Sequence, residues 1–179
     1  PDIELVTITG KAGTGKTFLT LVSAVEKVMN KDMKRIVVTR TMQPVGKEIG
    51  FLPGDINEKV EPWMGSIKDN FRAAYGNIMY YETMLQKGQI EITPISLIRG
   101  RTFNNTYIIV DEAQNSSIHE LKTLITRVGE NSKIVLLGDI DQIDTPYLDA
   151  KSSGLSIVID KLKKLKETGH VHLEKGERS

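Results

Sequence analysis

The sequence of 179 residues contains no cysteine. A disulfide framework, a thiolate zinc site and a cysteine nucleophile are therefore excluded, and a reducing compartment is compatible with the composition. No apolar run approaches the roughly 18 residues of a membrane span, and residues 1–10 lack the charged and then apolar pattern of a signal peptide. We therefore expect a soluble, cytoplasmic protein that has no membrane partner.

An excess of charge of one sign is also missing, because 24 Lys and Arg residues stand against 23 Asp and Glu residues, for a formal net charge of +1. Bulk electrostatics give no support for a polyanionic partner, so any nucleic-acid site must be a local patch. No repeat, low-complexity tract or linker divides the chain, and the length fits a single domain over residues 1–179. A start at Pro1, already inside a strand pattern, indicates a fragment of a longer chain.

The most specific motif is a phosphate-binding loop of the pattern Gly, four residues, Gly-Lys-Thr. Alternating residues over 3–9 predict a strand before it, and an apolar stripe predicts a helix after it that ends near Asn30. Glycines let successive backbone N–H groups face a polyphosphate, and the helix adds its positive end. In this motif Lys16 would reach the β and γ phosphates of a bound nucleotide, and the Thr17 hydroxyl would bind Mg2+. The loop comprises Gly10, Lys11, Ala12, Gly13, Thr14, Gly15, Lys16 and Thr17.

A second motif consists of four apolar residues, 107–110, followed by Asp111 and Glu112. The pattern predicts a central parallel strand that delivers two carboxylates to the edge where open α/β sheets bind ligands. Asp111 would hold the magnesium ion through water. Glu112 would orient or deprotonate the water that attacks the γ phosphate.

The remaining patterns predict an α/β fold with a mainly parallel central sheet. Ser117 and Glu120 form a capping box for a helix that ends at Gly129, and a further helix covers residues 155–165. Asp55 and Glu58 form another capping box, for a helix that Pro62 interrupts or bends. Strands are expected over 35–40, 89–93, 133–137 and 170–173.

Several polar and aromatic features have two interpretations each. Arg99 and Arg101 would contact phosphate or belong to a solvated turn, and Gln142 would sense the γ phosphate or lie in a plain polar loop. Residues 41–55 read as an irregular surface loop, and the lysines over 161–166 form a solvated helix end or a polyanion patch. Aromatic residues interleaved with Lys59, Lys68 and Arg72 would stack bases, or form core or a subunit contact: Trp63, Phe71, Tyr75, Tyr80 and Tyr81.

The chain resembles the PhoH family of P-loop ATPases along nearly all of its length. The resemblance rests on GKAGTGKT, on residues 39–55 (TRTMQPVGKEIGFLPGD), and on PWMGSIKDN, IRGRTF, YIIVDEAQN and GDIDQID. PYLDAKSSGL and GERS look most like the form in which this ATPase follows a PIN-type ribonuclease domain, a form associated with RNA unwinding and cleavage.

The resemblance implies a three-layer, RecA-like ATPase core that binds ATP and Mg2+, acts on single-stranded RNA and assembles as a ring. In that picture Gln142 couples the γ phosphate to motion, and Arg178 is an arginine finger, in this subunit or toward a neighbour's ATP. The region of Arg40 and Thr41 would lie near the nucleic-acid strand.

Our leading hypothesis from the sequence is a magnesium-dependent ATPase that drives RNA handling and is helicase-like. A P-loop kinase acting on a small metabolite is the alternative, although Glu112 beside Asp111 suits water activation better. A GTPase is disfavoured, because residues 30–33 (NKDM) lack the acid that guanine recognition would need. A nucleotide-gated binding module with negligible turnover is a third class.

Overall fold

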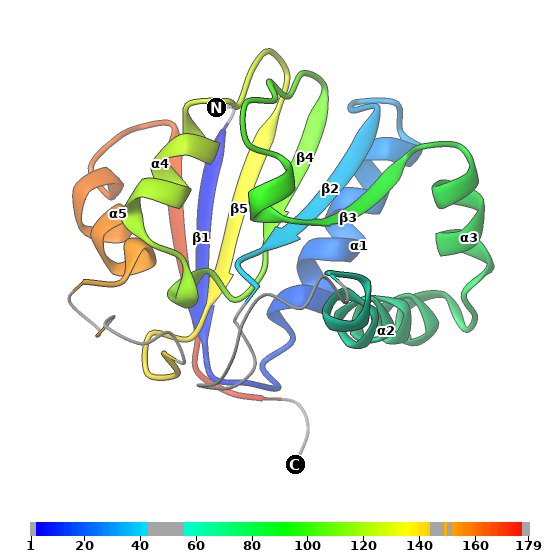
Figure 1. The fold of residues 1–179 in the computed structure, drawn as a ribbon, viewed down its shortest axis with the longest axis horizontal. Helices are drawn as coiled ribbons and strands as arrows, with labels where there is room; N and C mark the ends of the chain where they lie inside the picture. Colours follow the sequence, from blue (N-terminus) through cyan, green and yellow to red (C-terminus); the bar gives the residue numbers. More distant parts are fainter. Residues whose placement is uncertain (1–2, 43–55, 144–148, 150–151, 177–179) are drawn as a thin grey trace.

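The computed structural model describes residues 3–42, 56–143, 149 and 152–176, which contain one six-stranded sheet. Every strand pairs parallel to its neighbours, and the order across the sheet is β3-β2-β4-β5-β1-β6 (Figure 1). The strands are β1 (Leu5–Gly10), β2 (Arg35–Arg40), β3 (Ile90–Pro94), β4 (Thr106–Val110), β5 (Lys133–Gly138) and β6 (Thr168–Leu173).

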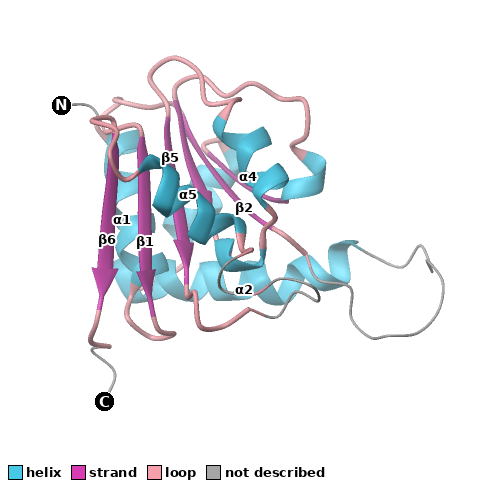
Figure 2. Ribbon diagram, turned by 90° about the vertical axis from the view of Figure 1, so that its left-hand side faces the viewer, coloured by secondary structure: helices cyan, strands magenta, loops and turns pink. Residues whose placement is uncertain are grey.

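Helices cover both faces of this sheet and produce three layers (Figures 1 and 2). One face carries α1 (Lys16–Met29), α2 (Ile56–Tyr75) and α3 (Met79–Gln86), and the other carries α4 (Ile118–Ile125) and α5 (Gly154–Leu162). Two short 3-10 turns, η1 (Ile95–Leu97) and η2 (Ala113–Asn115), follow β3 and β4. The expected three-layer P-loop fold is therefore confirmed. None of the helices in the described ranges has the length and apolar character needed to cross a bilayer.

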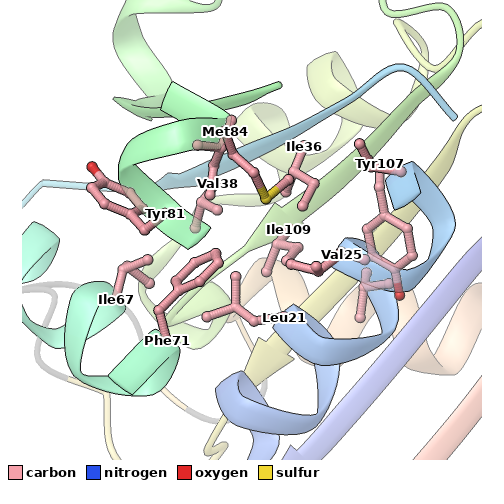
Figure 3. Packing of buried hydrophobic residues seen from close by; sticks show 14 of the residues in the cluster. Leu21, Val25, Ile36, Val38, Ile67, Phe71, Tyr81, Met84, Tyr107 and Ile109 are labelled. Carbon is pink, nitrogen blue, oxygen red and sulfur yellow. The ribbon is translucent and has the colours of Figure 1, made fainter. Parts of the chain in front are cut away.

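The larger core lies between the sheet and helices α1, α2 and α3 (Figure 3). Leu21 and Val25 of α1 bury the apolar stripe that the sequence predicted, and they meet Ile109 of β4. Three of the five clustered aromatic side chains, those of Trp63, Phe71 and Tyr81, are also buried here. Their burial favours the core interpretation of the cluster over base stacking.

The helices differ from the sequence prediction in their ends. The capping box of Ser117 and Glu120 opens α4 as expected, but α4 ends at Ile125 rather than Gly129, because residues 127–129 hydrogen-bond to Phe103 instead. Helix α5 ends at Leu162 rather than at residue 165. The Thr168 hydroxyl donates to the Leu162 carbonyl and replaces the next helical turn.

Two predictions concern the stretch between β2 and α2. Helix α2 continues through Pro62 rather than stopping there. The loop over 41–55 and the capping box of Asp55 and Glu58 lie outside the described residues, apart from Thr41 and Met42.

Candidate nucleotide site

The two principal motifs leave the sheet at the same edge, the carboxyl ends of the strands, which is the lower edge in Figure 1. Strand β5 lies between β1 and β4, with Thr9 opposite Gly138 and Val110 opposite Leu136. Adjacent strands lie about 4.8 Å apart, so the phosphate loop and Asp111 begin about 10 Å from each other. A phosphate chain and a hydrated ion have the dimensions to span that gap.

The phosphate loop is a compact turn between β1 and α1. Gly15, at the N-cap of α1, has a φ of 83°, a left-handed conformation that glycine adopts without strain. The Lys16 ammonium group donates to the backbone carbonyls of Gly10, at 2.7 Å, and Lys11, at 2.9 Å. The lysine thus folds over its own loop, where an incoming phosphate would compete with these two carbonyls.

Three carboxylates lie close enough to the Lys16 ammonium group to affect its pKa. Burial lowers the pKa of Lys16, and the negative charges of Asp139, Glu112 and Asp111 oppose that change, in this order of strength. Asp139 follows β5 directly, is buried and was not singled out from the sequence. Its position at a strand end was the signal that would have identified it.

Asp111 is a buried carboxylate that has a single side-chain donor among the described residues. The Trp63 indole N–H donates to Asp111 at 3.2 Å, and the Arg40 guanidinium lies 5.2 Å from the Trp63 ring centre. Burial, and then the charge of Glu112, raise the pKa of Asp111, while Arg40 and Trp63 act in the opposite direction. A cation at this carboxylate would offset the energetic cost of its negative charge.

The donor set fits a magnesium ion. Thr17 and Asp111 offer a hydroxyl and a carboxylate oxygen, and magnesium takes few protein ligands and retains several waters. Within the described ranges, no group of three or more His, Cys, Asp or Glu side chains is arranged to hold a metal by itself. In a site of this kind, waters and the phosphates would supply the remaining ligands.

Gln114 connects the ends of β4 and β5, a role that sequence reasoning missed. Its side-chain amide donates to Glu112 at 2.5 Å and accepts from the Asp139 backbone N–H at 3.2 Å. The side chain is fully buried, and a Cβ atom at Gly138 would lie 2.6 Å from its oxygen. Glu112 itself has a φ of 49°, which is uncommon for a residue other than glycine. The fold therefore fixes the backbone and carboxylate of Glu112 together.

The other two residues predicted to act in catalysis are Gln142 and Arg178. Gln142 is exposed on the turn after β5, where its backbone N–H donates to the Asp139 carbonyl. Arg178 lies outside the described residues, but the chain before it reaches the phosphate loop. A Cβ atom at Gly176 would lie 3.0 Å from the Gly13 carbonyl oxygen. His170 and His172 of β6 pair with Thr7 and Thr9 of β1.

A parallel α/β sheet with a phosphate loop between β1 and α1, and acids after β4, defines the P-loop NTPase fold. The family model described as PhoH-like protein matches residues 2–178, and this chain therefore belongs to the PhoH family.

Curated relatives agree with this assignment. Protein PhoH2 of Bacillus subtilis is 47% identical over 182 residues, covering 99% of this chain and 41% of the relative. A PhoH-like protein of the same organism is 39% identical, covering 96% of this chain and 53% of the relative. Protein PhoH of Escherichia coli is 38% identical, with coverages of 96% and 48%. The chain thus spans about half the length of these relatives.

Proposed function

We propose that this chain is a magnesium-dependent ATPase. The observation that carries the proposal is that Asp111, Glu112 and Asp139 follow the ends of β4 and β5 at the edge where the phosphate loop leaves the sheet, close enough to Lys16 to oppose the lowering of its pKa by burial. Membership of the PhoH family supports nucleotide binding and hydrolysis. A buried carboxylate next to a phosphate-binding loop is the arrangement that a cation and a triphosphate would complete.

Each residue has a separate task in this proposal. The amides of residues 10–17 bind the phosphates, and Lys16 exchanges its two carbonyl contacts for the β and γ phosphate oxygens. Thr17 and Asp111 hold the ion, which when bound neutralises charge developing on the phosphates. Glu112, held by Gln114, orients the attacking water and accepts its proton.

Hydrolysis in this site needs positioning and charge stabilisation rather than a covalent nucleophile. The hydrogen bond from Gln114 limits the freedom of the Glu112 carboxylate before any substrate arrives. Gln142, on the turn that begins with Asp139, would respond to the γ phosphate. Arg178 would supply positive charge to the transition state, in its own subunit or a neighbour's.

We further propose that ATP hydrolysis drives the unwinding or processing of single-stranded RNA, in a ring of identical subunits. Two observations support a link between the nucleotide site and such partners. Thr41, after β2, hydrogen-bonds to Ser116 beyond η2, so the expected RNA-facing region contacts the segment that carries Glu112. Gly176 lies against the phosphate loop two residues before Arg178. The cytoplasmic location stays a prediction.

The direct test is steady-state ATPase activity of the wild-type chain and of Glu112→Gln. The variant should bind Mg-ATP normally and lose turnover by about 10² to 10⁴, the usual contribution of a positioned base. Glu82→Gln, on the exposed surface of α3, is the matched control and should keep full activity. A wild-type chain without turnover, or a Glu112→Gln variant with normal turnover, would contradict the proposal.

The shared-site hypothesis has a separate test. If Arg178 acts on a neighbour's ATP, a mixture of Arg178→Ala and Glu112→Gln chains should regain part of the activity that each lacks alone. Mixtures as inactive as their components would exclude a site shared in this way, and ATPase activity would then be assigned to a single subunit.

A further inference from the structure

A cavity of about 220 Å³ lies away from the phosphate loop, between η1, the turn that follows η1, and α4. Its apolar lining includes Ile98 and Leu124, which are both buried. Its polar lining includes Ser96, Thr123 and the two arginines Arg99 and Arg127. An apolar floor with convergent polar groups is the usual composition of a ligand site.

The side chains of these two arginines form no hydrogen bond or ion pair with any other residue in the part of the chain that the structure describes. Both are exposed, and both are held by their backbones rather than by their side chains. Arg99 stands in a tight turn closed by the Arg101 N–H bonding to the Ile98 carbonyl, with Gly100 at a φ of 83°. The carbonyl of Arg127 accepts from the Phe103 N–H.

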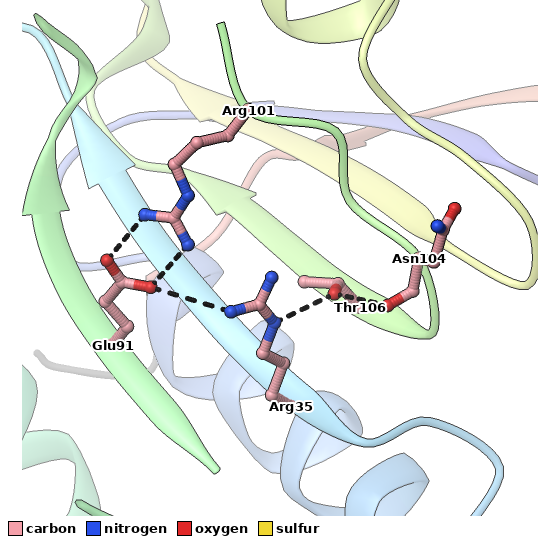
Figure 4. Close-up of polar contacts among 5 residues, drawn as sticks. All are labelled: Arg35, Glu91, Arg101, Asn104 and Thr106. Carbon is pink, nitrogen blue, oxygen red and sulfur yellow. Dashed lines mark hydrogen bonds and ion pairs between the residues drawn. The ribbon is translucent and has the colours of Figure 1, made fainter. Parts of the chain in front are cut away.

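Arg101, on the other side of Gly100, shows what a structural arginine looks like in this protein. It forms two hydrogen bonds with Glu91, at 2.7 and 2.9 Å (Figure 4). Its guanidinium also lies 5.1 Å from the Phe103 ring centre. These contacts anchor the turn and leave Arg99 to line the cavity. Two guanidinium groups that have no partner among the described residues form a local cationic patch at this cavity, in a chain of nearly balanced charge.

The volume and the lining residues of the cavity limit the class of ligand that it can bind. An apolar cavity of about 150 Å³ admits benzene, so 220 Å³ admits one nucleobase but not a whole nucleoside triphosphate. Guanidinium groups bind phosphate bidentately and stack on bases, and single-stranded nucleic acids offer both groups to proteins. Glu120, which also lines the cavity, accepts from Thr41 and from the Ser117 N–H, so its charge is partly satisfied.

We propose that this cavity, which we call the α4 pocket, binds one nucleotide unit of a single-stranded polynucleotide. The base lies on Ile98 and Leu124, and Arg99 and Arg127 bind the flanking phosphates. The choice of polynucleotide rests on the proposed RNA function, but the binding itself requires no hydrolysis. Glu120 joins the pocket to Thr41 and Ser116, and therefore to the segment that carries Gln114 and Glu112.

The test is equilibrium binding of a labelled ten-nucleotide oligouridylate, measured by fluorescence anisotropy over a salt series with Mg-ATP. The Glu112→Gln background keeps the ATP intact. Arg99→Ala combined with Arg127→Ala should weaken binding at least about tenfold. It should also lower the slope of log K against log salt by about 1.4, since each phosphate contact to a single strand contributes about 0.7.

Two further variants separate the base from the phosphates. Ser96→Phe fills the exposed side of the pocket, so it should weaken binding while leaving the salt slope unchanged. Lys122→Ala, on the same helix but outside the pocket, should alter affinity less than about twofold, because one exposed lysine contributes little by itself.

Four results would overturn the proposal. The double arginine variant binding as tightly as its parent, or no binding by the parent, would remove the site. Equal losses for Lys122→Ala would indicate a diffuse cationic surface. Uridine monophosphate competing as strongly as the oligomer would assign the pocket to a free nucleotide. The ATPase rate of the arginine variants without RNA, expected at the wild-type level, tests the proposed catalytic function separately from this binding.

Discussion

Charged side chains at the two ends of the sheet differ in how far other side chains of the protein neutralise them. Near the amino ends of β2, β3 and β4, Arg101 and Arg35 both contact Glu91, and Arg35 also bonds to Thr106 (Figure 4). The hydrogen bonds from Arg101 are the main cause of a lowered pKa for Glu91. At the carboxyl ends, burial raises the pKa of Asp111 and lowers that of Lys16.

We interpret the charges near Glu91 as structural and the charges near Asp111 as part of a ligand site. The Glu91 cluster satisfies its charges internally, and its ionised state is favoured in the folded chain. The Asp111 region places three acids near one lysine whose hydrogen bonds go to backbone carbonyls and to Thr14. Removal of a charge near Glu91 should therefore lower the free energy of unfolding. Removal of a charge near Asp111 should lower stability only in the presence of nucleotide.

The largest expected effect is the loss of ligand-dependent stability in Asp111→Asn. At 100 times its dissociation constant, Mg-ATP should stabilise the wild-type chain by about 2.7 kcal/mol, and most of this should vanish in the variant. Urea unfolding with and without Mg-ATP measures the difference. Asp160→Asn, on the exposed face of α5, is the control and should retain the full gain. An equal gain in Asp111→Asn would place the ion elsewhere.

The same variant should behave differently without ligand. The pKa of Asp111 is raised in the folded chain, so the folded state binds the proton more tightly than the unfolded state. Stability then falls as the pH rises between the unfolded and folded pKa values, and the cost persists at neutral pH. Asp111→Asn removes that cost, so ligand-free stability at neutral pH should be unchanged or about 1 kcal/mol higher. A clear loss would show that Asp111 is a structural acid like Glu91.

Gln114→Ala tests whether the candidate nucleotide site depends on the hydrogen bonds that Gln114 forms with Glu112 and Asp139. The change leaves the buried Asp139 N–H without its side-chain acceptor, which costs about 1–3 kcal/mol. It also releases the Glu112 carboxylate, so turnover should fall, but less than in Glu112→Gln. Urea unfolding and ATPase rates measure both effects, with Gln86→Ala at the exposed end of α3 as control. Unchanged turnover would remove Gln114 from the positioning of Glu112.

The smallest effect is expected at the structural cluster, in Glu91→Gln. The side chain is 37% exposed, so solvent screening limits the loss at neutral pH to about 0.5–1 kcal/mol. Because the pKa of Glu91 is lowered by folding, its contribution is present above the unfolded pKa and disappears as the pH falls through the folded pKa. Wild-type and variant unfolding curves should thus converge in acid, and ATPase activity should not change. A loss of ATPase activity would show that the Glu91 cluster affects the candidate nucleotide site.

Local sequence patterns were sufficient to predict the elements that form the candidate nucleotide site. The phosphate loop, the strand before Asp111 and the capping box at Ser117 each depend on residues within a few positions of one another. Parallel pairing then brings strand ends together by geometry alone. The shared edge of Lys16 and Asp111 could therefore be predicted.

Contacts between distant segments could not be predicted in this way. Arg99 and Arg101 look equivalent in the sequence, and only the position of Glu91 on β3 distinguishes them. Gln114 becomes important because Gly138 leaves room for its side chain beside β5. Helix α3 was missed because only Tyr81 and Met84 on its short length are buried, which gives a weak periodic pattern.

The contact between Trp63 and Asp111 has a practical consequence for all of these measurements. Trp63 is the only tryptophan in the sequence, and its indole N–H donates to the carboxylate that would carry the ion. The tryptophan fluorescence of the chain thus originates beside the proposed metal ligand, next to the Arg40 guanidinium. Arrival of a cation should alter the emission without any added dye, so the protein carries its own optical probe of nucleotide loading.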